Sequence, residues 1–130
     1  MKILFYLLAL TVILGSCKPE WTGNKKLDGE WTLTSSNGQA IPSTYSEIVT
    51  FSKKGSGGDV TTTVVENGLS TTATGIYTLL KNSTITFAYP NGNITGYPYD
   101  TAVFDINEYT KTTLKLTNQK DGTVIIYSKN

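Results

Sequence analysis

The stretch Leu27-Asp28-Gly29-Glu30-Trp31-Thr32-Leu33-Thr34 indicates how the chain folds. An Asp-Gly turn signal is followed at once by Trp31, and apolar and polar residues then alternate. Because successive side chains of a strand point to opposite faces, Trp31 and Leu33 share one face and Thr32 and Thr34 the other. A large aromatic side chain on the first strand, directly behind Gly29, predicts the plug at one end of a β-barrel.

Alternation of this kind recurs along the chain at a spacing of about ten residues. Thr, Tyr and Val are common and favour strands, and no window of ten or more residues beyond the N-terminal segment shows a helical period. Eight strands are predicted, at residues 30–35, 47–53, 59–66, 69–80, 84–89, 101–108, 112–118 and 123–129. Short turns such as Asn67-Gly68 join most of them. The predicted fold class is all-β, an eight-stranded antiparallel up-and-down β-barrel. The alternative is a β-sandwich, whose long connections only residues 36–46 and 89–100 could supply.

The N-terminal residues have the pattern of a secretory signal peptide. Met1-Lys2 supplies a positive charge, and residues 3–14 form an apolar run shorter than the roughly 20 residues of a membrane-spanning helix. The run ends in Leu14-Gly15-Ser16-Cys17, which resembles the lipobox of bacterial lipoproteins, whose Cys is lipidated after cleavage. The alternative is an ordinary signal peptide followed by an incidental Cys.

This pattern predicts a signal peptide over 1–16, a lipidated Cys17 with a tether over 17–26, and a barrel domain over 27–130. Acyl chains of the palmitate type would hold the protein to a membrane, since each buried CH₂ contributes about 0.8 kcal/mol. The expected location is the cell envelope, at the outer membrane, on its periplasmic or surface face.

The charged residues exclude several classes of function. The chain has 11 Lys plus Arg, all of them Lys, against 10 Asp plus Glu, and it has no His. Removal of Lys2 with the signal peptide leaves a neutral chain without Arg, which lacks the basic surface of a nucleic-acid binder. The lack of His removes the commonest general base and metal ligand. We therefore expect no nucleic-acid partner, no metal, no cofactor and no catalytic residue.

Three short motifs follow the lipobox and tether in order. They are Leu-Asp-Gly-Glu-Trp-Thr-Leu at 27–33, Gly-Ile-Tyr-Thr-Leu at 75–79 and Phe-Asp-Ile-Asn-Glu-Tyr-Thr-Lys-Thr-Thr-Leu-Lys-Leu at 104–116. Together they resemble the small lipocalin-like domains of bacterial lipoproteins. The resemblance implies that Gly29 and Trp31 occupy the Gly-x-Trp position that closes the barrel floor. The chain departs from true lipocalins because it has no Arg to stack on that Trp and no evident C-terminal helix.

Aromatic side chains provide the candidate binding residues. Those of the predicted strands face the barrel interior, where they form either a packed core or an apolar calyx. Those of the loop at 89–100 suit sugar faces or a partner protein, because Tyr combines apolar area with a polar tip, or they cover the barrel mouth. The candidate ligand-binding residues are Tyr77, Phe87, Tyr89, Tyr97, Tyr99 and Phe104.

The expected function is that of a non-catalytic binding module for a small hydrophobic molecule or a glycan. The alternative is a structural or interaction subunit of an envelope complex, with a filled barrel that presents loops to a partner protein. An internal cavity of roughly 300 Å³ or more, open at one end, favours the first. A filled interior with an exposed apolar patch around Tyr97 and Tyr99 favours the second.

Overall fold

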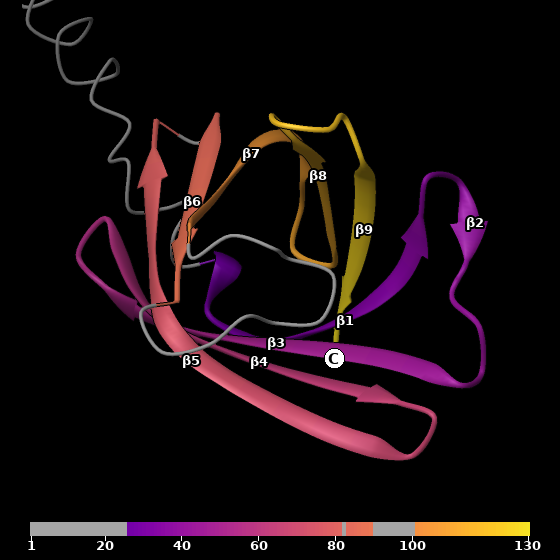
Figure 1. Ribbon diagram of the computed structural model, residues 1–130. Coiled ribbons are helices and arrows are strands. Elements are labelled where there is room, and N and C mark those ends of the chain that lie inside the picture. The colour runs from indigo at the N-terminus through magenta and orange to yellow at the C-terminus, as the bar shows by residue number, and fades with distance from the viewer. Residues whose placement is uncertain (1–25, 82, 90–100) are drawn as a thin grey trace, which may run out of the picture.

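The computed structural model describes residues 26–81, 83–89 and 101–130, which form nine strands (Figure 1). The strands are β1 (Gly29–Ser36), β2 (Gln39–Ala40), β3 (Tyr45–Lys54), β4 (Gly57–Glu66), β5 (Leu69–Leu80), β6 (Thr84–Ala88), β7 (Thr101–Tyr109), β8 (Thr113–Asn118) and β9 (Val124–Lys129). All eight predicted strands are present, and each boundary lies within two residues of its prediction. The additional strand, β2, pairs only with the end of β1, through Ser35 with Ala40 and Ser36 with Gln39.

Pairing of the first strand with the last closes the sheet into a barrel. Neighbouring strands follow the order β1, β3, β4, β5, β6, β7, β8, β9, and β9 pairs back onto β1. This seam runs from Trp31 opposite Lys129 to Ser36 opposite Ile125, with an irregularity between Leu33 and Ser35 of the kind that bends a strand. The prediction of an eight-stranded antiparallel barrel is confirmed, and the β-sandwich alternative is wrong.

Side-chain hydrogen bonds hold both ends of this seam. At one end the Asn130 amide donates to Glu30 Oε1 at 2.5 Å. At the other end the Asn37 backbone N–H donates to the Val124 carbonyl at 2.7 Å, and Asn37 Oδ1 accepts from the Val124 N–H at 2.9 Å. Asn37 and Gly38 both have positive φ, as a type I′ turn requires. The tight β1–β2 turn is thus fixed against β9.

Trp31 closes one end of the barrel. Its side chain is fully buried, and its indole Nε1 donates to the Leu27 carbonyl at 2.7 Å. Leu27 lies in a helical turn just before β1 and is itself buried. The Lys129 ammonium lies 5.5 Å from the centroid of the Trp31 ring, so in this Arg-free chain a Lys supplies the cation over the Trp.

A packed aromatic cluster fills the half of the barrel next to Trp31. Phe51 meets Tyr77 edge to face with ring centroids 5.0 Å apart, and Phe87 meets Phe104 in the same manner at 5.5 Å. Such edge-to-face pairs stabilise a core beyond the area that they bury. This half of the interior is therefore packed core, and Phe104 lies at its border with the other half.

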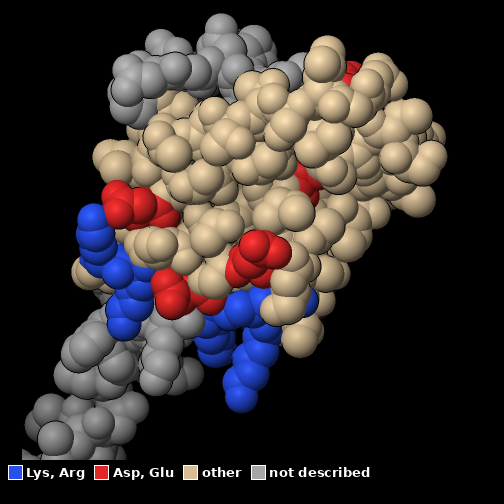
Figure 2. Space-filling model, turned by 90° about the horizontal axis from the view of Figure 1, so that it is seen from below, with Lys and Arg blue, Asp and Glu red and all other residues tan. Residues whose placement is uncertain are grey.

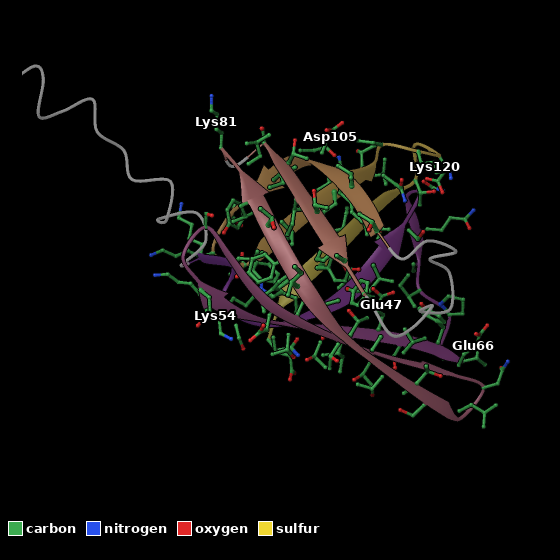
Figure 3. All side chains as sticks on the ribbon, turned by 60° about the vertical axis from the view of Figure 1, so that its left-hand side comes forward. Glu47, Lys54, Glu66, Lys81, Asp105 and Lys120 are labelled. Atoms are coloured by element: carbon green, nitrogen blue, oxygen red, sulfur yellow. The ribbon has the colours of Figure 1, made fainter. Side chains whose placement is uncertain are left out.

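Charged side chains are unevenly distributed over the barrel. Figure 2 shows one face on which the lysines and most acidic side chains gather towards one side, with a few acidic atoms elsewhere on a largely uncharged surface. Lys54 and Lys81 lie at the Trp31 end, whereas Glu66 and Lys120 lie at the other (Figure 3). Over the described residues, no helix is long and apolar enough to cross a membrane.

Candidate functional site: an acidic pocket at the open end of the barrel

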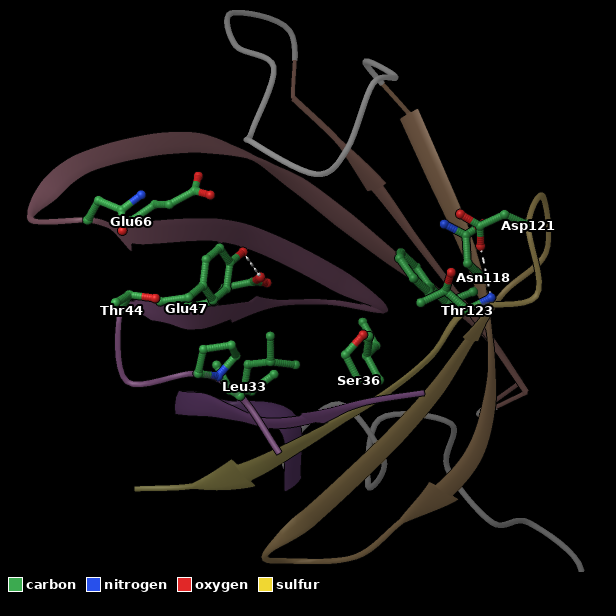
Figure 4. Close-up of a pocket in the computed structure, with 14 residues that line it drawn as sticks. Leu33, Ser36, Thr44, Glu47, Glu66, Asn118, Asp121 and Thr123 are labelled. Atoms are coloured by element: carbon green, nitrogen blue, oxygen red, sulfur yellow. Dashed lines mark hydrogen bonds between the residues drawn. The ribbon is translucent and has the colours of Figure 1, made fainter. Parts of the chain in front are cut away.

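A pocket of about 400 Å³ occupies the end of the barrel opposite Trp31 (Figure 4). The ends of β1, β3 and β9, the middle of β7, the connection after β2 and the turns after β4 and β8 contribute its walls. Its volume lies within the range of small-molecule sites. The lining residues are Leu33, Ser36, Ile41, Pro42, Thr44, Tyr45, Glu47, Glu66, Asn67, Phe104, Asn118, Asp121, Thr123 and Ile125.

Glu47 is the buried polar group of this pocket. It lies two residues before Val49 on β3, so the strand alternation turns it to the interior, where it is only 3% exposed. The Tyr45 hydroxyl donates to its Oε2 at 3.0 Å, and the Tyr127 hydroxyl donates to its Oε1 at 2.5 Å. A carboxylate accepts about four hydrogen bonds, so these two donors leave it able to accept more.

Burial raises the pKa of the Glu47 carboxyl, although the hydrogen bonds from Tyr127 and Tyr45 partly oppose this shift. A carboxyl whose pKa is raised by folding favours the fold below its ordinary pKa, and this contribution is lost as the pH rises through the raised value. The ionised carboxylate therefore opposes folding stability above that pH. Buried ionisable groups that lower the stability of the fold in this way are typical of functional sites.

The rim of the pocket carries two further carboxylates. Glu66 ends β4 beside the β4–β5 turn, on the same side of the pocket as Glu47, and Asp121 lies across from them in the β8–β9 turn (Figure 4). Asp121 Oδ1 accepts the backbone N–H of Thr123 at 2.8 Å, and this bond lowers the pKa of the Asp121 carboxyl. No lysine is among the residues that line the pocket.

Below the pocket, a polar layer separates it from the aromatic core. The Tyr89 and Thr62 hydroxyls are hydrogen-bonded at 2.9 Å, and burial raises the pKa of Tyr89 to about 12. They line a cavity of about 10 Å³ together with Glu47 and Tyr127, which is about the minimum space for one water molecule. Glu47 thus faces the open pocket on one side and this small cavity on the other.

The structure places the predicted binding residues at different depths. Tyr77 lies in the filled half against Phe51, and Phe87 and Tyr89 border the small cavity. Phe104 alone among the described candidates lines the open pocket. Tyr97, Tyr99 and the predicted lipidation site Cys17 lie outside the described residues.

Sequence reasoning missed Glu47 and Tyr45, which line the pocket, and Tyr127, which lines the small cavity and donates to Glu47. The sequence did contain a pattern that points two of them to the interior. Glu47 alternates in phase with Val49 and Phe51, and Tyr127 alternates in phase with Ile125. A Glu on the apolar face of a predicted strand is therefore the pattern to seek. Within the described part of the chain, no group of three side chains is placed to hold a metal ion.

Comparison with known proteins supports the architecture. Among solved structures, the chain is similar to a redesigned β-barrel, with a TM-score of 0.58 and 16% sequence identity over 83% of this chain and 95% of that chain. The fold is a β-barrel. No protein-family model and no curated protein matched the sequence. At this identity the likeness concerns the fold of the barrel alone.

Proposed function

We propose that the protein is an exported, lipid-anchored, lipocalin-like binding module that takes up a small molecule in the pocket opposite Trp31. The observation that supports this proposal most is the pocket itself. Its volume of about 400 Å³ exceeds the roughly 300 Å³ at which small-molecule sites begin, and its wall mixes apolar side chains with a few polar groups. No enzymatic step is part of the proposal, since the chain lacks His to activate its hydroxyl groups.

The direction of the barrel fits a tethered binding module. The described chain begins at Lys26, whose carbonyl accepts from the Lys129 ammonium at 2.9 Å at the Trp31 end. A tether that precedes Lys26 would therefore join the barrel at its closed end. The pocket would then open on the side away from the point of attachment.

Native mass spectrometry of the purified protein tests the binding function. We expect a co-purifying small molecule on the wild type and its loss from Thr44→Trp, because Thr44 is an exposed residue of the pocket wall and an indole there would occupy the space. Ser43→Trp is the matched control, since Ser43 is exposed beside Thr44 but does not line the pocket. An equal ligand load on the two variants would contradict binding in this pocket.

Metabolic labelling with a radioactive fatty acid tests the anchor. We expect cells that express the full chain to incorporate label into the wild type and not into Cys17→Ala, because Cys17 is the only thiol of the chain. Ser16→Ala keeps a small residue before the Cys and serves as the control. Label that persists in Cys17→Ala would exclude lipidation at that residue.

A second candidate is the interaction subunit. Ile76 and Leu80 are 55% and 61% exposed, and both lie on the outer face of β5, where they offer apolar area to a partner protein. The filled half of the barrel is also compatible with that role. The interaction-subunit hypothesis predicts that the native mass spectrum of the wild type shows no bound small molecule. The binding-module hypothesis predicts that it shows one.

A further inference from the structure

The pocket opposite Trp31 has the chemistry of a site for a cation. Three carboxylates line it, those of Glu47, Glu66 and Asp121, and its other polar side chains are neutral. The lysine nearest in sequence to Asp121, Lys120, lines a separate pocket beside β7. Low-dielectric walls lined by one sign of charge concentrate counter-charged ligands. A neutral apolar molecule or an anion would bring no positive charge to these carboxylates.

Glu47 is the deepest of the three carboxylates. It is buried at the base of the pocket, where its two oxygens are held by the Tyr45 and Tyr127 hydroxyls, and it keeps acceptor capacity. A buried carboxylate is costly unless a cation and hydrogen bonds accompany it. Among the described residues, the side-chain donors to Glu47 are the Tyr45 and Tyr127 hydroxyls, which carry no positive charge. A positively charged ligand group would supply the missing cation.

The apolar part of the pocket wall indicates what the uncharged body of the ligand must be. Leu33, Phe104 and Ile125 are apolar and buried, so the ligand body that meets them must be apolar. The Tyr45 ring also lines the pocket beside Glu47, and an ammonium group over an aromatic face gains a further attraction. The volume of about 400 Å³ limits the whole to a small molecule.

We infer that the pocket binds a small primary amine, with its ammonium group on Glu47 beside Tyr45 and its apolar body against Leu33, Phe104 and Ile125. This inference rests on the proposed binding function and narrows its ligand class from hydrophobic molecules in general to organic cations. Glu66 and Asp121 at the rim attract the cation from solvent, and Glu47 fixes its orientation.

Calorimetric titration with three compounds of one shape tests the inference. The probes are 2-phenylethylamine, 2-phenylethanol and 3-phenylpropionate at pH 7, which carry an ammonium, a hydroxyl and a carboxylate group on the same apolar body. On the wild type we expect the amine to bind at least tenfold more tightly than the alcohol, and the carboxylate not to bind. This ratio decides the inference even if a variant fails to fold.

Variants assign the effect to Glu47. Glu47→Gln keeps the shape of the side chain and removes its charge, and we expect it to weaken amine binding at least tenfold and to leave alcohol binding within threefold. Glu108→Gln removes one exposed carboxylate of β7 that does not line the pocket, and should leave both affinities unchanged. Equal loss in both variants would overturn the assignment to Glu47.

The outcomes also separate this inference from the binding function. If the alcohol binds as tightly as the amine and Thr44→Trp abolishes both, the amine class is wrong and the pocket still serves as a binding site. If none of the three probes binds and the native mass spectrum shows no ligand, the inference and the binding function fail together.

Discussion

Trp31→Ala is expected to lower the free energy of unfolding by about 3–5 kcal/mol, as large-to-small substitutions of buried aromatic residues do. The Trp31 side chain is fully buried at the closed end of the barrel, where β1 pairs with both β3 and β9. Its removal leaves a cavity under the helical turn at Leu27 and takes away the donor to the Leu27 carbonyl. The Lys129 ammonium loses its aromatic partner at the same time.

Urea denaturation followed by far-ultraviolet circular dichroism measures this loss without depending on Trp fluorescence. Leu69→Ala is the control, because Leu69 is a large apolar side chain that is 77% exposed, and its removal should change stability by less than about 0.5 kcal/mol. A Trp31→Ala protein as stable as the wild type would contradict the role of Trp31 as the plug of the barrel.

Strand positions could be predicted from the sequence because they depend on local pattern. The two-residue side-chain period and the Asn-Gly and Asp-Gly turns are visible in any short window. The Asn67-Gly68 turn has positive φ at both residues, as its sequence predicts. β2 escaped prediction because two residues carry no period, and it exists only where the Asn37-Gly38 turn folds back onto β1.

The site could be predicted less well because it depends on closure of the barrel. Which inward-facing side chains meet at the open end is set by the β1–β9 seam and by the relative register of all eight barrel strands. Aromatic residues were the natural candidates, yet of those described only Phe104 lines the open pocket. Glu47 was overlooked because a Glu in a strand is usually solvated, and only its phase with Val49 and Phe51 places it inside.

The closed and open halves therefore have different roles in one chain. Packing of Trp31, Phe51 and Tyr77 supplies stability at one end, and this allows the other end to keep a pocket and a buried carboxylate that packing alone would not favour. The polar layer of Thr62 and Tyr89 marks the boundary. A substitution in the closed half should mainly change stability, and one at Glu47 should mainly change binding.

Gly75 lies on β5 beside Tyr89, where the polar layer of Thr62 and Tyr89 meets the barrel wall. The first half of β5 pairs with β4 alone, and from Ile76 onwards it pairs also with β6. A Cβ atom on Gly75 would lie 2.1 Å from the Ala88 carbonyl oxygen and 2.9 Å from the Tyr89 ring. The motif at 75–79 echoes the one at 29–33 in sequence, but Gly75 is required for close approach of two strands and Gly29 for its positive φ.

Gly75→Val is therefore expected to destabilise the barrel by about 3 kcal/mol or more, and Gly75→Ala by about 1–3 kcal/mol, because β5 and β6 must separate to admit the new side chain.

Both values are measured by the same urea denaturation. Thr74→Val is the matched control, since it places the same isopropyl group on the adjacent exposed position and should change stability by less than about 0.5 kcal/mol. A Gly75→Val protein as stable as Thr74→Val would contradict the clash with the Ala88 carbonyl. Because the clash also displaces the Tyr89 ring, Gly75→Ala should disturb the Tyr89–Thr62 hydrogen bond beneath Glu47 and so weaken ligand binding beyond its effect on stability.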